Sequence, residues 1–530
     1  MQLYRAVLGR AFCTTAYIHE GRAKINKFVT DENGTLHESF YNPAQVFNRD
    51  LSLLTYLTYM VRMQEAQPLK RNSFNYLDAF SASGLRAIRA KLELPPQLLS
   101  DVIACDISPS SIKVLHQNMH LNGLESQKAR IDVVLGDCRT KMIERREDGR
   151  LQYDMIDLDP FGTSLPYIGA AIAGAKHLGI IGTTFTDLKV IEGPDQHKLF
   201  SLYGAKRSIN LPNKEDISLR IVLASINKEA NKHKKTIRPL ISFWRNFYCR
   251  VFFQVIDNAT AVKENLTLQQ ELYSCPECGD HFLHGYFNSS LRKHRLRPKD
   301  FCPTDVNPDC KRGWEVTGPL WTGPLYDPTF VLDTYHLLQA CSESSDQPED
   351  RPFSMTVKNL DLIAPGYKLE LSTSKIISGM LWSMLEESKV SGSSYYLPVD
   401  PVELCKILGV PNFPRKQMYT ALANAGFGFA RSYINGDTFV TDAPLGFIYK
   451  VVWQLSTQGN PSFQPKTPEG RKFVSMAASC ELPVSFAENP LVNETVKRQQ
   501  PTFIRDAAGQ GPLKKTKPGI RPASDHTTPQ

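Results

Sequence analysis

Between residues 74 and 256, short apolar segments alternate with segments whose apolar residues recur at helical spacing. The clearest helical segment, residues 81–94, carries Leu85, Ile88 and Leu92 on one face and ends at two prolines. Such an alternation is typical of βαβ units, which build a parallel sheet covered by helices. We therefore predict an α/β domain over this part of the chain.

Apolar runs rich in β-branched and aromatic residues mark the individual strands of this domain. They cover residues 74–80, 100–106, 130–137, 153–159, 178–187, 238–244 and 247–256. After the second run, Ser108 can cap a helix that has Pro109 in its first turn and Gly123 at its end. Strands and helices thus follow one another as βαβ units require.

The regular alternation stops near residues 263–272, where we expect a domain boundary. Residues 24–265 are predicted to form the α/β domain, and residues 266–483 a smaller α+β domain. A helix followed by a hairpin with the sequence "INGD" predicts a winged-helix-like part in the smaller domain. Residues 1–23 are expected to be a targeting or disordered segment, and the basic residues 484–530 a disordered tail.

The composition narrows the class of protein. The chain has 530 residues, of which 42% are hydrophobic and 22% charged, as expected for more than one globular domain. It contains no apolar run of about eighteen residues, so we expect no membrane span. The net charge of +8 is unevenly spread, which favours a polyanionic partner, although each basic cluster could equally be a solvated surface. The clusters are Lys232, Lys234, Lys235 and Arg238, and Arg292, Lys293, His294, Arg295, Arg297 and Lys299.

Most of the eleven cysteines are scattered singly, which is typical of a protein in a reducing compartment. Four are grouped, namely Cys275, Cys278, Cys302 and Cys310. Because four thiolates can close a tetrahedral zinc site, this group is a candidate structural metal site. The alternative is a degraded site whose thiols are simply buried.

In an open parallel sheet, ligands bind beyond the carboxyl ends of the strands. The first strand ends in Asp78, and a turn of small residues with Ser83 and Gly84 then lets a ligand approach the backbone. The second strand ends in Asp106, whose carboxylate can accept hydrogen bonds from both hydroxyls of a ribose. The third ends in Asp137, which can accept from an adenine amino group. Together these residues indicate a nucleoside-containing cofactor.

A dinucleotide-dependent dehydrogenase would use the same turn and ribose carboxylate, but its turn normally carries three glycines that accommodate a pyrophosphate. The turn here has Gly84 alone. S-adenosylmethionine contains no phosphate, so it is the cofactor that this turn favours. The sequence therefore indicates methyl transfer.

The fourth strand ends in "MIDLDPFGTS", residues 155–164. An exocyclic amine of a nucleobase is a poor nucleophile because its lone pair is delocalised into the ring. Asp159 and the carbonyl of Pro160 are acceptors that can orient such an amine toward a methyl sulfonium, and Phe161 can stack on the base. An isolated D-P-F would more simply be a helix cap beside a core phenylalanine, but the strand-end residues upstream favour the amine site. We expect Asp157 to orient Asp159 rather than to react.

Five segments, in this order, resemble the tRNA guanine-26 N2-dimethyltransferase family. They are "YNPAQVFNRDLS" (41–52), "SASGLRAIRA" (81–90), "IDLDPFGTS" (156–164), "FTDLKV" (185–190) and "GPLWTGPLYD" (318–327). The resemblance implies a class I, Rossmann-like methyltransferase fold, S-adenosylmethionine as cofactor and a C-terminal domain that helps to hold tRNA. The details "DPFGTS", "KHLGIIG" and "VTDAPLGF" are similar to the metazoan paralogue branch of the family, whose members need not share the target nucleotide.

The family pattern also implies roles for individual residues. Arg49 and Arg86 would help to bind the cofactor. The adenosine part would be held by Asp106, Asp137 and Cys138, and the amine site would consist of Asp159, Pro160 and Phe161. The cysteine group departs from the two C-x2-C pairs of many eukaryotic members, because seven residues separate Cys302 from Cys310.

The leading hypothesis is a tRNA guanosine N2-methyltransferase that places one or two methyl groups on the exocyclic amine of guanosine 26 or a neighbour. The alternative is a catalytically inactive tRNA-binding or chaperone protein on a methyltransferase fold. The partner is tRNA, and no obligate protein partner is evident. The basic tail and the N-terminal segment indicate the nucleus, the mitochondrion or both.

Overall fold

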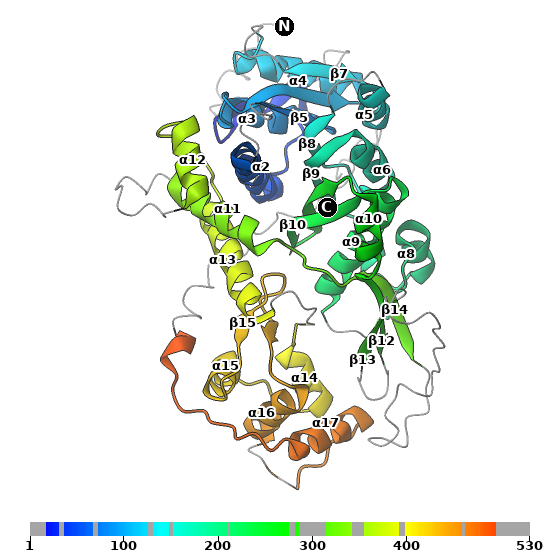
Figure 1. The fold of residues 1–530 in the computed structure, drawn as a ribbon, viewed down its shortest axis with the longest axis vertical. Coiled ribbons are helices and arrows are strands. Elements are labelled where there is room, and N and C mark those ends of the chain that lie inside the picture. The colour runs from blue at the N-terminus through cyan, green and yellow to red at the C-terminus, as the bar shows by residue number, and fades with distance from the viewer. Residues whose placement is uncertain are drawn as a thin grey trace, which may run out of the picture.

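The computed structural model describes residues 17–30, 36–66, 73–125, 131–147, 152–208, 213–274, 281–285, 314–341, 354–391, 398–457, 460 and 462–493. These residues form an elongated molecule with an α/β unit at one end and a smaller, mainly helical unit at the other (Figure 1). Between the two ends run α11 (Pro328–Cys341), α12 (Met355–Ile363) and α13 (Ser374–Ser391). Within the described ranges, no helix combines the length and the apolar character needed to cross a bilayer.

Among the described residues, seven strands form one large sheet in the order β10-β11-β9-β8-β5-β6-β7. They are β5 (Phe74–Asp78), β6 (Leu99–Asp106), β7 (Asp132–Leu135), β8 (Tyr153–Leu158), β9 (Ala175–Phe185), β10 (Thr236–Arg245) and β11 (Tyr248–Ile256). Neighbours from β9 to β7 pair in parallel, whereas β11 runs antiparallel to both β9 and β10. The predicted α/β sheet is confirmed, and each predicted strand overlaps an observed one.

Two groups of helices pack on this sheet (Figure 1). The first group is α2 (Val46–Ala66), α3 (Leu85–Glu93) and α4 (Pro109–Leu121), and the second is α5 (Cys138–Glu147), α6 (Leu165–Gly174) and α9 (Lys214–Lys232). The predicted cap Ser108 accepts a hydrogen bond from the backbone N–H of Ser111, and Pro109 occupies the first turn of α4. The local signals therefore predicted this helix correctly.

Short elements connect the large ones. They are β1 (Tyr17–Glu20), which pairs with β2 (Ala23–Asn26), β3 (Phe28–Thr30), which pairs with β4 (Leu36–Glu38), η1 (Pro43–Gln45), α7 (Leu188–Ile191), α8 (Gln196–Tyr203) and α10 (Ala259–Leu266). The β1–β2 hairpin lies against α3 and α4. It therefore ties the N-terminal part of the described chain to the helices that follow β5 and β6.

Helix α2 is buried along most of its length, because it lies between β9 on one side and α11, α12 and α13 on the other. Most of its side chains are apolar, as such a position requires. Its N-terminal end instead buries polar side chains, namely Asn48, Arg49, Asp50 and Ser52. Buried charges are costly unless they are paired, so this end of the helix depends on partners from other elements.

The hydrophobic core of the α/β unit extends beyond the seven-stranded sheet. A small sheet with the order β13-β12-β14 contributes Leu272, Leu320 and Trp321 to it. Its strands are β12 (Gln269–Ser274), β13 (His281–Gly285) and β14 (Glu315–Trp321). Apolar residues of α11, α12 and α13 join the same core, so these three helices pack as part of the α/β unit.

A second hydrophobic core lies at the other end of the molecule, around residues such as Met418, Leu422 and Phe447. It is formed by α14 (Pro401–Leu408), α15 (Arg415–Asn424), β15 (Phe429–Arg431), β16 (Phe439–Thr441), α16 (Leu445–Thr457) and α17 (Pro468–Ser479). Val399 adds an antiparallel bridge to Phe439 of the hairpin. The domain limits 24–265 and 266–483 stay predictions.

Gly182 in β9 tests how closely side chains of α2 and of the neighbouring strand β11 pack over β9. A Cβ at this position would lie 2.6 Å from the Tyr56 hydroxyl and 2.7 Å from Nη2 of Arg250. We expect Gly182→Ala to lower the free energy of unfolding by about 1–3 kcal/mol, because the surrounding core cannot expand freely. Urea denaturation followed by circular dichroism measures this change.

Gly169→Ala in α6 is the matched control. The nearest atoms to a Cβ there are 3.7 Å away, so we expect unchanged stability or a gain of up to about 1 kcal/mol from the better helix former. Equal effects of the two substitutions would contradict the close approach at Gly182.

Candidate active site

The carboxyl ends of β5, β6, β7 and β8 bring most of the predicted residues to one edge of the sheet. In the strand register, Asp78 lies beside Asp157 of β8 and beside Ala104 of β6. Asp106 ends β6 two residues farther on, and Asp159 follows the end of β8. The structure therefore places these carboxylates at one edge of the sheet, as expected for residues at the carboxyl ends of parallel strands.

The D-P-F segment leaves the sheet directly after β8. Pro160 is buried, Asp159 is half-buried, and Phe161 is 61% exposed. The segment is held by Thr186, whose hydroxyl accepts the Gly162 N–H at 2.8 Å and whose N–H donates to the Gly162 carbonyl at 2.9 Å. The loop thus presents one carboxylate and one aromatic ring at the edge of the sheet.

Arg86, from the first turn of α3, holds the Asp159 carboxylate. Its Nε and Nη2 both donate to Oδ2 of Asp159. Burial alone raises the pKa of Asp159, but the Arg86 and Arg250 guanidiniums outweigh it and keep this pKa below its usual value. Asp159 is therefore ionised near neutral pH, and it is a hydrogen-bond acceptor.

Asp157 is fully buried beneath this pair. Its Oδ2 accepts from Arg250 at 2.6 Å and from the Tyr56 hydroxyl at 2.9 Å, and Nη1 of Arg86 lies 3.7 Å away. Arg250 also donates to Thr184 and thereby reaches β9. Asp157 is thus a charged neighbour of the arginine that holds Asp159. The expectation that Asp157 orients Asp159 stays a prediction.

Phe161 has an aromatic neighbour that the sequence analysis did not single out. The ring of Phe40 lies edge-on to it, with centroids 5.5 Å apart and planes at 81°. Phe40 is itself 49% exposed. It directly precedes the family-like segment 41–52, and that adjacency was the only sequence signal for it.

The turn between β5 and α3 approaches Asp106 closely. Oδ2 of Asp106 accepts the Ala82 N–H at 2.8 Å, and Oδ1 accepts the Ser108 N–H at 2.9 Å. Gly84 has a φ of 80°, and a Cβ there would lie 2.8 Å from Leu115, so the turn requires glycine. Ser83 is buried and uses its carbonyl to accept from Asn118.

Asp137 and Cys138 lie at the end of β7 and the start of α5. The Arg139 side chain donates to both Asp137 oxygens and lowers the pKa of that carboxyl. Burial raises the pKa of the Cys138 thiol to about 12, so this thiol is neutral and acts as an apolar surface. Neither residue has the character of a nucleophile.

Arg49 does not contact the D-P-F segment directly. Its Nε and Nη2 donate to the two oxygens of Glu20 at 2.7 and 2.5 Å, and its guanidinium lies 5.2 Å from the centre of the Tyr41 ring. Glu20 comes from β1, which the sequence analysis did not connect with the site. The partner of Arg49 is therefore decided by the tertiary structure.

Asp78 is 1% exposed, and neither of its carboxylate oxygens receives a well-formed hydrogen bond from any described residue. Burial and the adjacent Asp157 raise the pKa of Asp78 to about 7, while Arg86 and the Phe80 backbone N–H only partly oppose this rise. A buried carboxylate without strong donors is costly. It is the group at this edge that is best suited to receive donors from a ligand.

The predicted zinc ligands Cys275, Cys278, Cys302 and Cys310 lie outside the described residues. Within the described ranges, no three histidine, cysteine or acidic residues gather in a way that could hold a metal ion. Of the first basic cluster, Lys235 is buried and donates to the Ile172 carbonyl at 3.0 Å. This lysine therefore does not contribute to a basic surface.

Sequence comparisons show which known proteins this chain resembles. A family model for the N2,N2-dimethylguanosine tRNA methyltransferases matches residues 21–352. The mitochondrial tRNA (guanine(26)-N(2))-dimethyltransferase of Saccharomyces cerevisiae is 26% identical over 543 residues, which cover 91% of this chain and 89% of the yeast protein. The tRNA (guanine(26)-N(2))-dimethyltransferase of Mus musculus is also 26% identical and covers 96% of this chain and 78% of its own length.

A solved structure supports the fold. Trm1 from Pyrococcus horikoshii, in complex with S-adenosyl-L-methionine, aligns with a TM-score of 0.61 over 82% of this chain and 99% of its own. The two sequences are 22% identical. At this sequence identity, the structural similarity shows a shared fold and nothing further.

Asp78→Asn tests the strained carboxylate at the edge of the sheet. Because the folded-state pKa of about 7 lies above the usual 3.8, Asp78 favours folding at low pH, and this contribution is lost as the pH rises through 7. The rise corresponds to at most about 4 kcal/mol. We expect Asp78→Asn to raise the free energy of unfolding at pH 8 relative to wild type, and to do so less at pH 5, measured by urea denaturation.

Asp101→Asn, at an exposed position on β6, is the control and should leave the difference between pH 5 and pH 8 unchanged. A loss of stability in Asp78→Asn at pH 8 would show that the carboxylate already has adequate partners within the protein.

Proposed function

This chain belongs to the N2,N2-dimethylguanosine tRNA methyltransferase family, and we propose that it transfers one or two methyl groups from S-adenosylmethionine to the exocyclic amine of a tRNA guanosine. The target is guanosine 26 or a neighbouring guanosine. The observation that carries the proposal is the ionised Asp159, held by Arg86 beside the exposed ring of Phe161. This pair combines an acceptor for an amine with a surface for a base.

Asp159 and the Pro160 carbonyl accept the two N–H groups of the guanine amine and align its nitrogen with the methyl group. When bound, S-adenosylmethionine would supply an electrophilic methyl group on a sulfonium, whose S–CH3 bond would break as the N–CH3 bond forms, with release of a neutral thioether. The amine nitrogen becomes positively charged in the transition state, so the negative charge on Asp159 stabilises that state. Asp159 then accepts the amine proton and releases it to water.

The cofactor would lie along the edge formed by β5, β6 and β7. Its ammonium group would donate to the Asp78 carboxylate, whose oxygens receive no well-formed hydrogen bond from the described residues. Asp106 would accept from the ribose hydroxyls, and Asp137 with Cys138 would border the adenine. Ser83 and Gly84 form the turn beneath it, while Arg49 and Arg86 provide positive charge for its carboxylate.

The target base would be held by stacking. Phe161 and Phe40 are both exposed and lie next to each other at the mouth of the site. A guanine rotated out of its helix would stack on Phe161 and contact Phe40 at its edge, which compensates for part of its lost stacking in RNA.

The rest of the tRNA would be bound through phosphate contacts and shape. Residues 266–483 are the proposed C-terminal tRNA-binding part. Within it, the separate core of α14 to α17 with the β15–β16 hairpin is the proposed winged-helix-like unit. The proposed location is the mitochondrion, the nucleus or both, and the yeast relative is named as a mitochondrial enzyme.

A structural zinc ion completes the proposal. The ion would be bound by four thiolates, those of Cys275, Cys278, Cys302 and Cys310.

We expect purified protein to contain about one zinc ion per chain. Cys275→Ser should lose the ion and melt at a lower temperature. Metal analysis by mass spectrometry and thermal melting measure both effects, with Cys480→Ser as the control. Zinc-free wild-type protein whose melting is unaffected by chelators would contradict this part of the proposal.

Asp159→Ala tests the function itself. We expect methyl transfer to fall at least about 100-fold, because the acceptor that orients the amine is lost, while binding of tRNA changes little. The readout is nucleoside mass spectrometry of a tRNA transcript, which separates N2-methylguanosine from N2,N2-dimethylguanosine. Asp101→Ala, at the far end of β6, is the control.

Normal methylation by Asp159→Ala would refute the amine-site assignment. Wild-type protein that binds tRNA but no S-adenosylmethionine would favour the inactive tRNA-binding alternative instead.

A further inference from the structure

Arg89 is the centre of a buried network that joins four parts of the chain. This arginine of α3 is 1% exposed. Its Nε and Nη2 bind the Glu93 carboxylate at 2.8 and 3.0 Å, and its Nη1 donates to Glu20 of β1 and to Asp50 of α2, each at 2.7 Å. One guanidinium thereby fixes the hairpin, α2 and α3 relative to each other.

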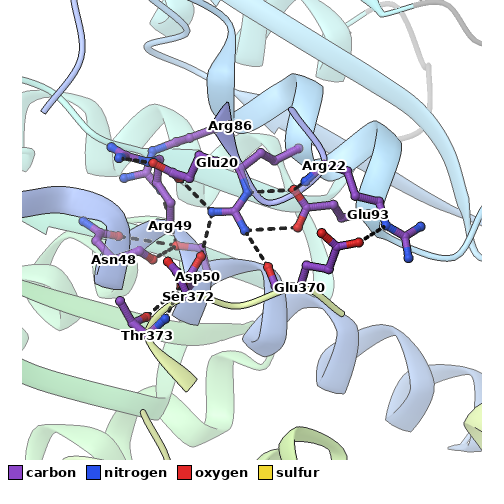
Figure 2. A network of polar contacts seen from close by, with 12 residues as sticks. Glu20, Arg22, Asn48, Arg49, Asp50, Arg86, Glu93, Glu370, Ser372 and Thr373 are labelled. Carbon is purple, nitrogen blue, oxygen red and sulfur yellow. Dashed lines mark hydrogen bonds and ion pairs between the residues drawn. The ribbon is translucent and has the colours of Figure 1, made fainter. Parts of the chain in front are cut away.

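Glu20 connects this centre with Arg49. Its Oε1 accepts from Arg89 and from Nε of Arg49, both at 2.7 Å, and its Oε2 accepts from Nη2 of Arg49. Although burial by itself raises the pKa of Glu20, the two guanidiniums lower it to about 2. The Glu20 carboxylate thus sets the orientation of Arg49 (Figure 2). Arg89 holds the same carboxylate.

The fourth part of the network comes from the segment that leads into α13. Oδ2 of Asp50 accepts from the Thr373 N–H at 2.9 Å, the Thr373 hydroxyl at 2.8 Å and the Ser372 hydroxyl at 3.2 Å. The Glu370 carbonyl accepts from Nη2 of Arg89. This segment is about 320 residues away from Asp50 along the chain.

The excess of negative charge in the network explains why Asp50 needs the donors of residues 372 and 373. Three buried carboxylates, those of Glu20, Asp50 and Glu93, face the two guanidiniums of Arg49 and Arg89. Coulomb pairing within the network is therefore incomplete, and Oδ2 of Asp50 depends on neutral donors. Residues 372 and 373 supply them, so undocking this segment would leave a buried carboxylate oxygen without donors, which is costly.

The same two helices carry the groups assigned to the cofactor and the amine. Arg49 is the neighbour of Asp50 on α2, and Arg86 lies one helical turn before Arg89 on α3. Ser52 of α2 also accepts from Arg86 at 3.3 Å. A change in the position of α2 relative to α3 must therefore move Arg49 and Arg86 relative to each other.

We infer that Thr373 and Asp50 are positioning residues through which the α11–α13 layer strengthens binding of S-adenosylmethionine. The inference rests on the proposed function, because it takes Arg49 and Arg86 as the cofactor's cationic partners. It extends the proposed role of the C-terminal part from holding tRNA to holding the cofactor site in its binding geometry.

Thr373→Val tests this inference, because it removes the hydroxyl that donates to Asp50 but keeps the shape and the backbone N–H. We expect the Kd and KM for S-adenosylmethionine to rise on the order of fivefold. At saturating cofactor, kcat and the Kd for tRNA should stay within about twofold of wild type. Calorimetry with the full chain gives the cofactor Kd, and transfer of labelled methyl groups gives KM and kcat.

Two variants make the result specific. Thr373→Ser keeps the hydroxyl and should restore wild-type binding of S-adenosylmethionine. Thr334→Val removes a buried hydroxyl from α11 of the same layer, where it donates to the Phe330 carbonyl at 2.7 Å, and should leave the cofactor Kd unchanged.

An unchanged cofactor Kd in Thr373→Val, in a wild-type background that binds S-adenosylmethionine and methylates tRNA, would overturn the inference and leave the proposed function standing. Weaker tRNA binding with unchanged cofactor binding would also overturn it. An equal increase of the cofactor Kd in Thr334→Val would assign the effect to general loosening of the layer and would overturn it as well. Wild-type protein that binds no S-adenosylmethionine would refute the proposed function and this inference together.

Discussion

The structure depends on pairing buried guanidiniums with buried carboxylates around the N-terminal end of α2. Arg49 and Arg89 lie on one side of this end with Glu20, Asp50 and Glu93, and Arg86 and Arg250 lie on the other with Asp157 and Asp159. Each ion is expensive to bury, and it is tolerated only where several donors and acceptors meet it. These pairs therefore add little net stability, but they restrict how α2, α3, β8 and β11 can be placed relative to one another.

That restriction gives neighbouring carboxylates different properties. Asp159 accepts hydrogen bonds from Arg86 and has a lowered pKa. Asp78 is buried at the same edge of the sheet with weaker partners and has a raised pKa. Asp157, the register partner of Asp78 on β8, accepts hydrogen bonds from Arg250 and from the Tyr56 hydroxyl. Environments that separate the pKa values of adjacent acids are typical of functional sites. Here the separation agrees with the proposed roles, in which Asp159 accepts from an amine and Asp78 accepts from the cofactor.

The C-terminal half of the chain has two structural roles. Helices α11, α12 and α13 pack into the core of the α/β unit, and the segment before α13 completes the hydrogen bonds of Asp50. Residues from α14 onward form a core of their own at the far end of the molecule (Figure 1). The core at that end is therefore separate from the layer of helices that packs against α2.

The sequence by itself determined the order of strands and helices, because strand and helix periodicities and the caps at Ser108 and Gly123 are local signals. It also determined that Asp78, Asp106 and Asp159 meet at one edge, because the carboxyl ends of parallel strands must do so. The roles of these residues and the zinc ligands stay predictions. Only the tertiary structure decided that Glu20 holds Arg49, that Arg250 supports Asp157, that Phe40 lies beside Phe161 and that Thr373 reaches Asp50. These partners are far apart in sequence, and the fold selects them by which side chains share a buried volume, a property that no local pattern encodes.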